Sequence, residues 1–123
     1  MKRVILILDD DENTRCALTG ILTEGGFETL ETTNVPEAIN TIRAKRIDLA
    51  IVDIKMPIVD GYKFCEFLRN SEQYSYIPIV ILTAEEKRYG RGKAKQLKIE
   101  AFVEKPFDPD NLIGKVNKIL SSP

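Results

Sequence analysis

The sequence has 123 residues, 43% of them hydrophobic and 30% charged, which is typical of one globular domain. Its 18 basic and 19 acidic side chains give a net charge of −1, whereas a nucleic-acid-binding domain is usually basic. No apolar run approaches the ~18 residues of a membrane span. Histidine is absent, which excludes His-based zinc sites and Ser-His-Asp or Cys-His catalysis. We therefore expect one cytoplasmic domain over residues 1–123 that binds neither nucleic acid nor membrane.

The first apolar run, residues 4–8, is cut off by acidic residues and predicts a strand buried on both faces, as in a parallel sheet. A helix is predicted over 12–24, before the pair Gly25-Gly26 ends it. The residues at helical spacing that predict its apolar face are Cys16, Ala17, Ile21 and Leu22. Cys16 and Cys65 lack CxxC spacing, and we expect both to be reduced, buried thiols.

The middle of the chain repeats this alternation of strand and helix. A short strand is predicted over 27–31, followed by a helix over 35–45 for which Asn34 is the predicted N-cap. A third buried strand is predicted over 48–52. A loop containing proline and glycine follows it, and the next helix is predicted over 61–70.

The last third of the chain adds two more strand–helix units. Strands are predicted over 79–82 and 101–103, and helices over 85–98 and 109–120. Five such units joined by right-handed crossovers give an α/β fold, a three-layer sandwich with a parallel five-stranded sheet.

Polar or charged side chains follow four of the five predicted strands. These residues are Asp9, Asp10 and Asp11 after the first strand, Asp53 after the third, Thr83 after the fourth and Lys105 after the fifth. The carboxyl ends of parallel strands lie at one edge of the sheet, where ligands of such sheets bind. We therefore expect these side chains to lie close together.

Carboxylates that lie a few ångströms apart repel one another, by a few kcal/mol per close pair at an effective dielectric constant of about 20. Either a proton or a cation must offset that repulsion, and a hard cation with oxygen ligands such as Mg²⁺ fits best. Lys105 adds a fixed positive charge and Thr83 a hydroxyl, so the set predicts a site for a phosphoryl group. Asp53, at the end of a buried strand, is the predicted nucleophile, which would form an aspartyl phosphate.

Each of these residues alone also has an ordinary structural explanation. The acidic run 9–12 could serve only to start a helix, and Asp53 and Thr83 could be caps or turn residues. Lys105 could be a solvated surface side chain. Their coincidence at one edge of the sheet favours the site.

Four segments of the sequence together resemble the receiver domain of two-component response regulators. They are Leu6-Ile7-Leu8-Asp9-Asp10-Asp11, Asp53-Ile54-Lys55-Met56-Pro57-Ile58-Val59-Asp60-Gly61, Leu82-Thr83-Ala84 and Lys105-Pro106-Phe107. Their order and spacing carry the resemblance, which covers essentially the whole chain. It implies a flavodoxin-like sheet with strand order 2-1-3-4-5, as in chemotaxis regulators.

The resemblance also implies a role for each residue of the site. Asp53 would accept a phosphoryl group from a phosphohistidine on a sensor kinase or phosphotransfer protein. Asp10, Asp53 and the backbone carbonyl of Lys55 would bind Mg²⁺ directly, and Asp9 would bind it through a water molecule. Asp11 would only start a helix. The domain would not be an enzyme but a phosphoacceptor that assists its own phosphorylation and dephosphorylation.

In the same family, phosphorylation changes the face formed by the fourth helix, the fifth strand and the fifth helix, which contacts a downstream protein or output domain. Lys105 and Thr83 would each contact a phosphoryl oxygen, and Thr83 would move to do so. Phe102 would be the aromatic switch residue, and we expect it to be more buried than a tyrosine there. The resemblance further implies a cis peptide bond between Lys105 and Pro106.

The sequence leaves two alternatives to a receiver that is phosphorylated. A degenerate receiver would act as a phosphate-independent interaction module, although the complete acidic, threonine and lysine set argues against it. An aspartate-nucleophile phosphatase of the haloacid dehalogenase type also has a parallel sheet, and Asp9-x-Asp11 superficially fits its DxD motif. Asn13 departs from that motif, and the chain is short for that fold.

Overall fold

All five predicted strands form. The apolar runs 5–8, 49–52 and 79–82 are buried throughout, whereas the strands over 28–32 and 101–104 are partly exposed. The computed structural model describes residues 2–53, 61–83 (for residue 83 the backbone only) and 95–121. The elements are β1 (Val4–Leu8), α1 (Glu12–Glu24), β2 (Glu28–Thr32), α2 (Val35–Ala44), β3 (Leu49–Asp53), α3 (Gly61–Asn70), β4 (Ile79–Thr83), β5 (Ala101–Glu104) and α5 (Pro109–Ser121). The helix predicted over 85–98 falls mostly outside these ranges.

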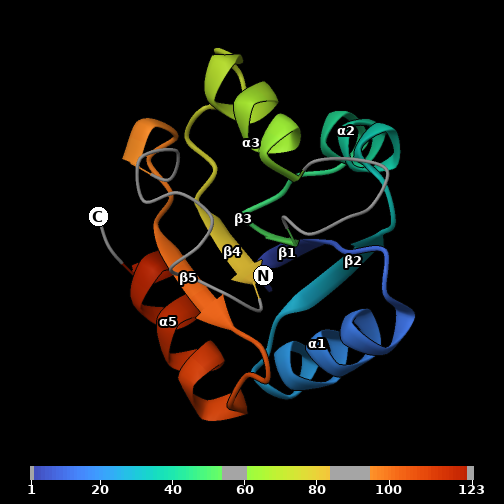
Figure 1. Cartoon of the computed structure of the whole chain (residues 1–123), viewed down its shortest axis with the longest axis vertical. Helices are drawn as coiled ribbons and strands as arrows, with labels where there is room; N and C mark the ends of the chain where they lie inside the picture. Colours follow the sequence, from blue (N-terminus) through green and yellow to red (C-terminus); the bar gives the residue numbers. More distant parts are fainter. Residues whose placement is uncertain (1, 54–60, 84–94, 122–123) are drawn as a thin grey trace.

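The five strands form one parallel sheet in the order β2-β1-β3-β4-β5. β1 lies between β2 and β3, so the chain reverses its direction of travel across the sheet after β2 (Figure 1). The carboxyl ends of β1 and β3 are therefore neighbours at the point of reversal, where such sheets bind ligands. The predicted α/β class and strand order are confirmed.

The sheet separates two hydrophobic clusters, because successive residues of a strand point to opposite faces. Leu6 and Leu8 pack on one side with residues of α2 and α3, such as Ile42 and Phe64. Residues of β1 that alternate with them pack on the other side with α1 and α5. Figure 1 shows these helices in two layers with the sheet between them, which confirms the three-layer sandwich. No helix within the described ranges has the length and apolar character needed to cross a membrane.

The apolar face of α1 differs from the prediction. Leu18 and Leu22 are the residues buried against the sheet, whereas Cys16 is exposed. Residues four apart share one helix face, but Cys16 is rotated by about 200° from Leu18 and therefore faces solvent. The prediction of two buried thiols was wrong for Cys16 and is confirmed for Cys65, and both cysteines are free.

Several strands extend one residue further than predicted, into the polar residues at their carboxyl ends. Asp53 pairs with Leu82 and Thr83 pairs with Glu104 in the ladder of the sheet. The backbone positions of Asp53 and Thr83 are therefore fixed by strand pairing rather than by loop conformation. Asn34 caps α2 as predicted, by accepting a hydrogen bond from the Glu37 N–H at 2.8 Å.

Candidate functional site

Three carboxylates meet at the carboxyl ends of β1 and β3. Asp9 and Asp10 follow β1 directly, and Asp53 is the last residue of β3. One carboxylate oxygen from each of the three lies within 4.8 Å of the others. Asp9 and Asp53 are buried and Asp10 is exposed, so the cluster is open to solvent on the Asp10 side.

In the described part of the chain, Lys105 is the cation that faces this cluster. It follows β5, and its Nζ atom lies 3.6 Å from Asp9 Oδ2 and 3.5 Å from Asp53 Oδ2. Within the described residues, one ammonium group against three carboxylates leaves excess negative charge in a partly buried cluster, where charges interact more strongly than in water. These described residues therefore favour a further cation.

The surroundings of Asp9 change the pKa of its carboxyl group. Burial raises its pKa from 3.8 to about 6. The Asp11 backbone N–H, which donates to Asp9 Oδ1 at 2.9 Å, opposes that rise. The nearby Asp53 charge adds to the rise and Lys105 reduces it. Asp9 Oδ2 is buried and lies 3.6 Å from Lys105 Nζ, but it accepts no hydrogen bond from the described residues, so it is a hard oxygen donor that a cation could use.

Asp11, the third acidic residue of the run, has a different role. Its carboxylate accepts hydrogen bonds from the Thr14 N–H at 3.1 Å and the Thr14 hydroxyl at 2.6 Å, so it is the N-cap of α1. These hydrogen bonds lower the pKa of Asp11. The prediction that Asp11 starts the helix is confirmed.

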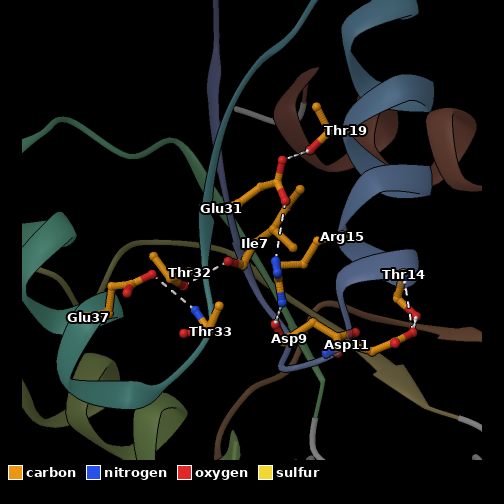
Figure 2. A network of polar contacts seen from close by, with 10 residues as sticks. All are labelled: Ile7, Asp9, Asp11, Thr14, Arg15, Thr19, Glu31, Thr32, Thr33 and Glu37. Carbon is orange, nitrogen blue, oxygen red and sulfur yellow. Dashed lines mark hydrogen bonds and ion pairs between the residues drawn. The ribbon is translucent and has the colours of Figure 1, made fainter.

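Arg15 contacts the site and was not predicted from the sequence. Its Nη1 atom donates to the backbone carbonyl of Asp9 at 2.8 Å, and its Nε atom lies 3.3 Å from Glu31 Oε1 (Figure 2). Glu31 also accepts a hydrogen bond from the Thr19 hydroxyl at 2.9 Å. The only signal for Arg15 in the sequence is a basic residue in the first turns of a helix that directly follows the acidic run.

The remaining predicted site residues are described only in part. Thr83 ends β4 beside β5, but its side chain lies outside the described part of the chain, as does all of Lys55. Phe102 is partly buried against the cluster on the α2 and α3 side. The peptide bond between Lys105 and Pro106 is cis, as expected.

Comparison with known proteins decides the family. The family model of the response regulator receiver domain matches residues 5–117. The chain belongs to this family. The receiver is 35% identical over 118 residues to the response regulator Rre1 of Synechocystis, covering 95% of the chain and 51% of that protein. It is 34% identical to the "Probable transcriptional regulator ycf29" of Cyanophora paradoxa, covering 95% of the chain and 56% of that protein. The chain thus spans about half the length of these curated relatives.

Solved structures of receivers superpose closely on this one. The chemotaxis response regulator CheY4 of Vibrio cholerae has a TM-score of 0.88 at 26% identity, over 97% of this chain and 99% of that one. The receiver domain of sensor histidine kinase PA1611 from Pseudomonas aeruginosa has a TM-score of 0.89 at 22% identity, over 99% and 100% of the two chains. The PA1611 structure has a magnesium ion coordinated in its active site cleft. At that identity the likeness to PA1611 shows a shared fold.

Proposed function

We propose that this receiver accepts a phosphoryl group on Asp53 from a phosphohistidine of a sensor kinase or phosphotransfer protein, in a reaction that depends on Mg²⁺. The observation that carries the proposal is the environment of Asp53. Asp53 is 3% exposed and ends a central strand, and its carboxylate lies beside the Lys105 ammonium group and the carboxylates of Asp9 and Asp10. The whole domain, residues 1–123, would work in the cytoplasm.

The residues present fit a magnesium ion. Mg²⁺ prefers carboxylate, carbonyl and water oxygens, and the pocket offers three carboxylates, including the Asp9 oxygen that accepts no hydrogen bond within the described ranges. Asp10, Asp53 and the carbonyl of Lys55 would hold the ion directly, and Asp9 would hold it through water. When bound, the ion would neutralise charge on the phosphoryl oxygens.

The residues of the chain have separate roles in the transfer. An Asp53 carboxylate oxygen attacks phosphorus, and the bond from phosphorus to the donor histidine nitrogen breaks as the new O–P bond forms. Lys105 would pair with a phosphoryl oxygen, and its 3.5 Å contact with Asp53 Oδ2 supports this role. Thr83 would donate its hydroxyl to another phosphoryl oxygen. The domain contains no histidine, so the phosphohistidine must belong to another protein or domain.

The signal would reach a partner through the face predicted for the helix over 85–98, β5 and α5, of which residues 85–94 lie outside the described ranges. Phosphorylation adds roughly −1.5 to −2 charge and three acceptor oxygens at Asp53. Thr83, at the end of β4, would move toward them, and Phe102 on the neighbouring strand would turn inward. Lys115 of α5 donates to the Phe102 carbonyl at 2.6 Å, so β5 and α5 are directly joined at this switch position. A downstream protein or output domain would bind the rearranged face.

Phosphorylation with a small-molecule donor tests the proposal. The protein is incubated with acetyl phosphate and Mg²⁺, and its intact mass is measured. We expect the wild type to gain one phosphoryl group, and Asp53→Ala or chelation of Mg²⁺ to abolish the gain. Asp110→Asn, which alters an exposed aspartate in the first turn of α5, should be labelled like the wild type. An unlabelled wild type would instead support the phosphate-independent interaction module.

A further inference from the structure

We infer that Arg15 is a positioning residue for the magnesium site, and that Glu31 holds Arg15 in place. The inference rests on the proposed Mg²⁺ function. Arg15 binds the main chain of the acidic pair, not its carboxylates, through the hydrogen bond from Nη1 to the Asp9 carbonyl. Its side chain is 14% exposed, so most of its length is packed inside the protein.

The acidic pair needs such support because of strand geometry. Successive side chains of a strand point to opposite faces, so two consecutive residues can direct their carboxylates into one pocket only where the chain leaves the strand conformation. The β1 ladder ends at Leu8, and the chain bends at Asp10. One oxygen each of Asp9 and Asp10 nevertheless lies within the 4.8 Å cluster. The orientation of the peptide between these two residues therefore decides whether both carboxylates reach the ion.

Arg15 fixes the orientation of the peptide between Asp9 and Asp10. A peptide unit is planar, so the hydrogen bond to the Asp9 carbonyl also sets the direction of the bond that leads into Asp10. The other side of Asp9 is fixed by its N–H, which donates to the Thr32 carbonyl at 3.1 Å. Together these hydrogen bonds hold Asp9 on both sides after the sheet ladder has ended.

Glu31 holds Arg15 and balances its charge. Glu31 Oε1 lies 3.3 Å from Arg15 Nε, and Glu31 Oε2 accepts from Thr19, one turn further along α1 (Figure 2). The carboxylate of Glu31 therefore fixes the direction of the guanidinium from β2. It also offsets a positive charge that would otherwise oppose a metal cation in the pocket.

Positioning and simple charge effects predict opposite results. Arg15→Gln removes a positive charge near a cation site, which by electrostatics alone would tighten Mg²⁺ binding. If Arg15 positions the acidic pair, the same change weakens binding, by roughly tenfold for the loss of a residue that orients a ligand. Arg15→Lys keeps the charge but cannot bond Asp9 and Glu31 in the same fork geometry, so we expect weaker binding there too.

Calorimetric titration of the apo-protein with MgCl₂ tests the inference. We expect Arg15→Gln to weaken binding most and Glu31→Gln to weaken it less. The double variant should be no weaker than Arg15→Gln, because both changes act through one contact. Arg46→Gln, an equal charge change in an exposed side chain that pairs with Asp48, is the matched control and should bind like the wild type.

Labelling by acetyl phosphate gives a second measurement. The Mg²⁺ concentration for half-maximal labelling should rise in Arg15→Gln, while the rate at saturating Mg²⁺ stays near that of the wild type. Equal or tighter Mg²⁺ binding by a folded Arg15→Gln protein would overturn the inference. If that variant does not fold, wild-type affinity in both Arg15→Lys and Glu31→Gln would overturn it. A wild type that binds no Mg²⁺ would instead refute the proposed function.

Discussion

The Nζ atom of Lys105 lies 3.5 Å from Asp53 Oδ2, although 52 residues separate the two in the sequence. Asp53 ends β3 and Lys105 follows β5, and β4 lies between these strands in the sheet. Lys105 therefore reaches across the end of β4 to the buried carboxylate. This contact depends on the strand order of the whole fold, and it joins the residue proposed to be phosphorylated to the cation proposed to stabilise the transferred group.

Substitution of Lys105 by methionine should separate metal binding from phosphoryl transfer. Without the ammonium group, less positive charge competes with Mg²⁺, so binding near pH 8 should become tighter. The rate of labelling by acetyl phosphate should fall by about tenfold or more, because a charged donor to the phosphoryl oxygens is lost. Calorimetry and time-resolved intact mass measure the two effects. Faster labelling in Lys105→Met would contradict the proposed role.

The raised pKa of Asp9 predicts how stability depends on pH in the metal-free protein. Its pKa is 3.8 in the unfolded reference and about 6 in the folded protein, so the folded state binds more protons between these values. Because the unfolded state binds fewer protons in this range, raising the pH favours unfolding. The contribution of Asp9 to stability is therefore lost as the pH rises through about 6. Asp9→Asn cannot ionise and keeps an acceptor for the Asp11 N–H. In EDTA, its melting temperature should exceed that of the wild type by several degrees at pH 7.5 and by much less at pH 4.

Magnesium should reverse this pH dependence. Protons and Mg²⁺ compete for the same carboxylates, so the ion should raise the melting temperature of the wild type more at pH 8 than at pH 5. Thermal melts at the two pH values, with MgCl₂ and with EDTA, measure the difference. An equal stabilisation at both pH values would show that Asp9 does not take part in metal binding.

Asp11 should behave differently from its two acidic neighbours. Because its carboxylate caps α1 through Thr14, Asp11→Ala should lower the melting temperature modestly while leaving Mg²⁺ affinity and labelling close to those of the wild type. Asp10→Ala provides the comparison and should lose most of the Mg²⁺ affinity. Loss of labelling in Asp11→Ala would instead favour the DxD arrangement of a phosphatase.

Arg69 should be important for stability rather than for signalling. Its guanidinium donates to four backbone carbonyls, those of Leu97, Ser75, Ile77 and Lys98, and it also pairs with Glu100 at 2.9 Å. Glu100 in turn accepts from the Ile79 N–H at 2.8 Å. Arg69→Ala should therefore lower the free energy of unfolding by about 3 kcal/mol, as measured by urea denaturation. Arg43→Ala, in an arginine that lies over the Phe67 ring, should cost less than about 1 kcal/mol.

The positions of the strands and the polar residues at their carboxyl ends could be predicted from the sequence. Apolar runs such as 4–8 are buried on both faces and can be recognised in the sequence without knowing which strands they pair with. The carboxyl ends of parallel strands lie at one edge of the sheet, and this rule predicted that Asp9, Asp53 and Lys105 lie close together. The roles of Arg15 and Arg69 could not be predicted, because their acceptors are mostly backbone carbonyls, which leave no signature in side-chain patterns.

The orientation of α1 was the part of the fold that the sequence described incorrectly. Cys16, Ala17, Ile21 and Leu22 formed one acceptable helical face, but the helix docks through Leu18 and Leu22. The capping hydrogen bonds of Asp11 and the contact of Arg15 with Asp9 hold the first turns of α1 against the end of β1. With the helix held in this orientation, Cys16 faces solvent. These polar contacts form only when α1 packs against the end of β1, so the helical spacing of apolar residues does not reveal them.

The most direct test of the central claim is to locate the phosphoryl group. After labelling with acetyl phosphate and Mg²⁺, hydroxylamine converts an aspartyl phosphate into a hydroxamate that tandem mass spectrometry assigns to one residue. We expect the hydroxamate on Asp53, and its loss when Mg²⁺ is chelated. A hydroxamate on Asp9 or Asp10, or at no aspartate at all, would contradict the assignment of Asp53 as the phosphoacceptor.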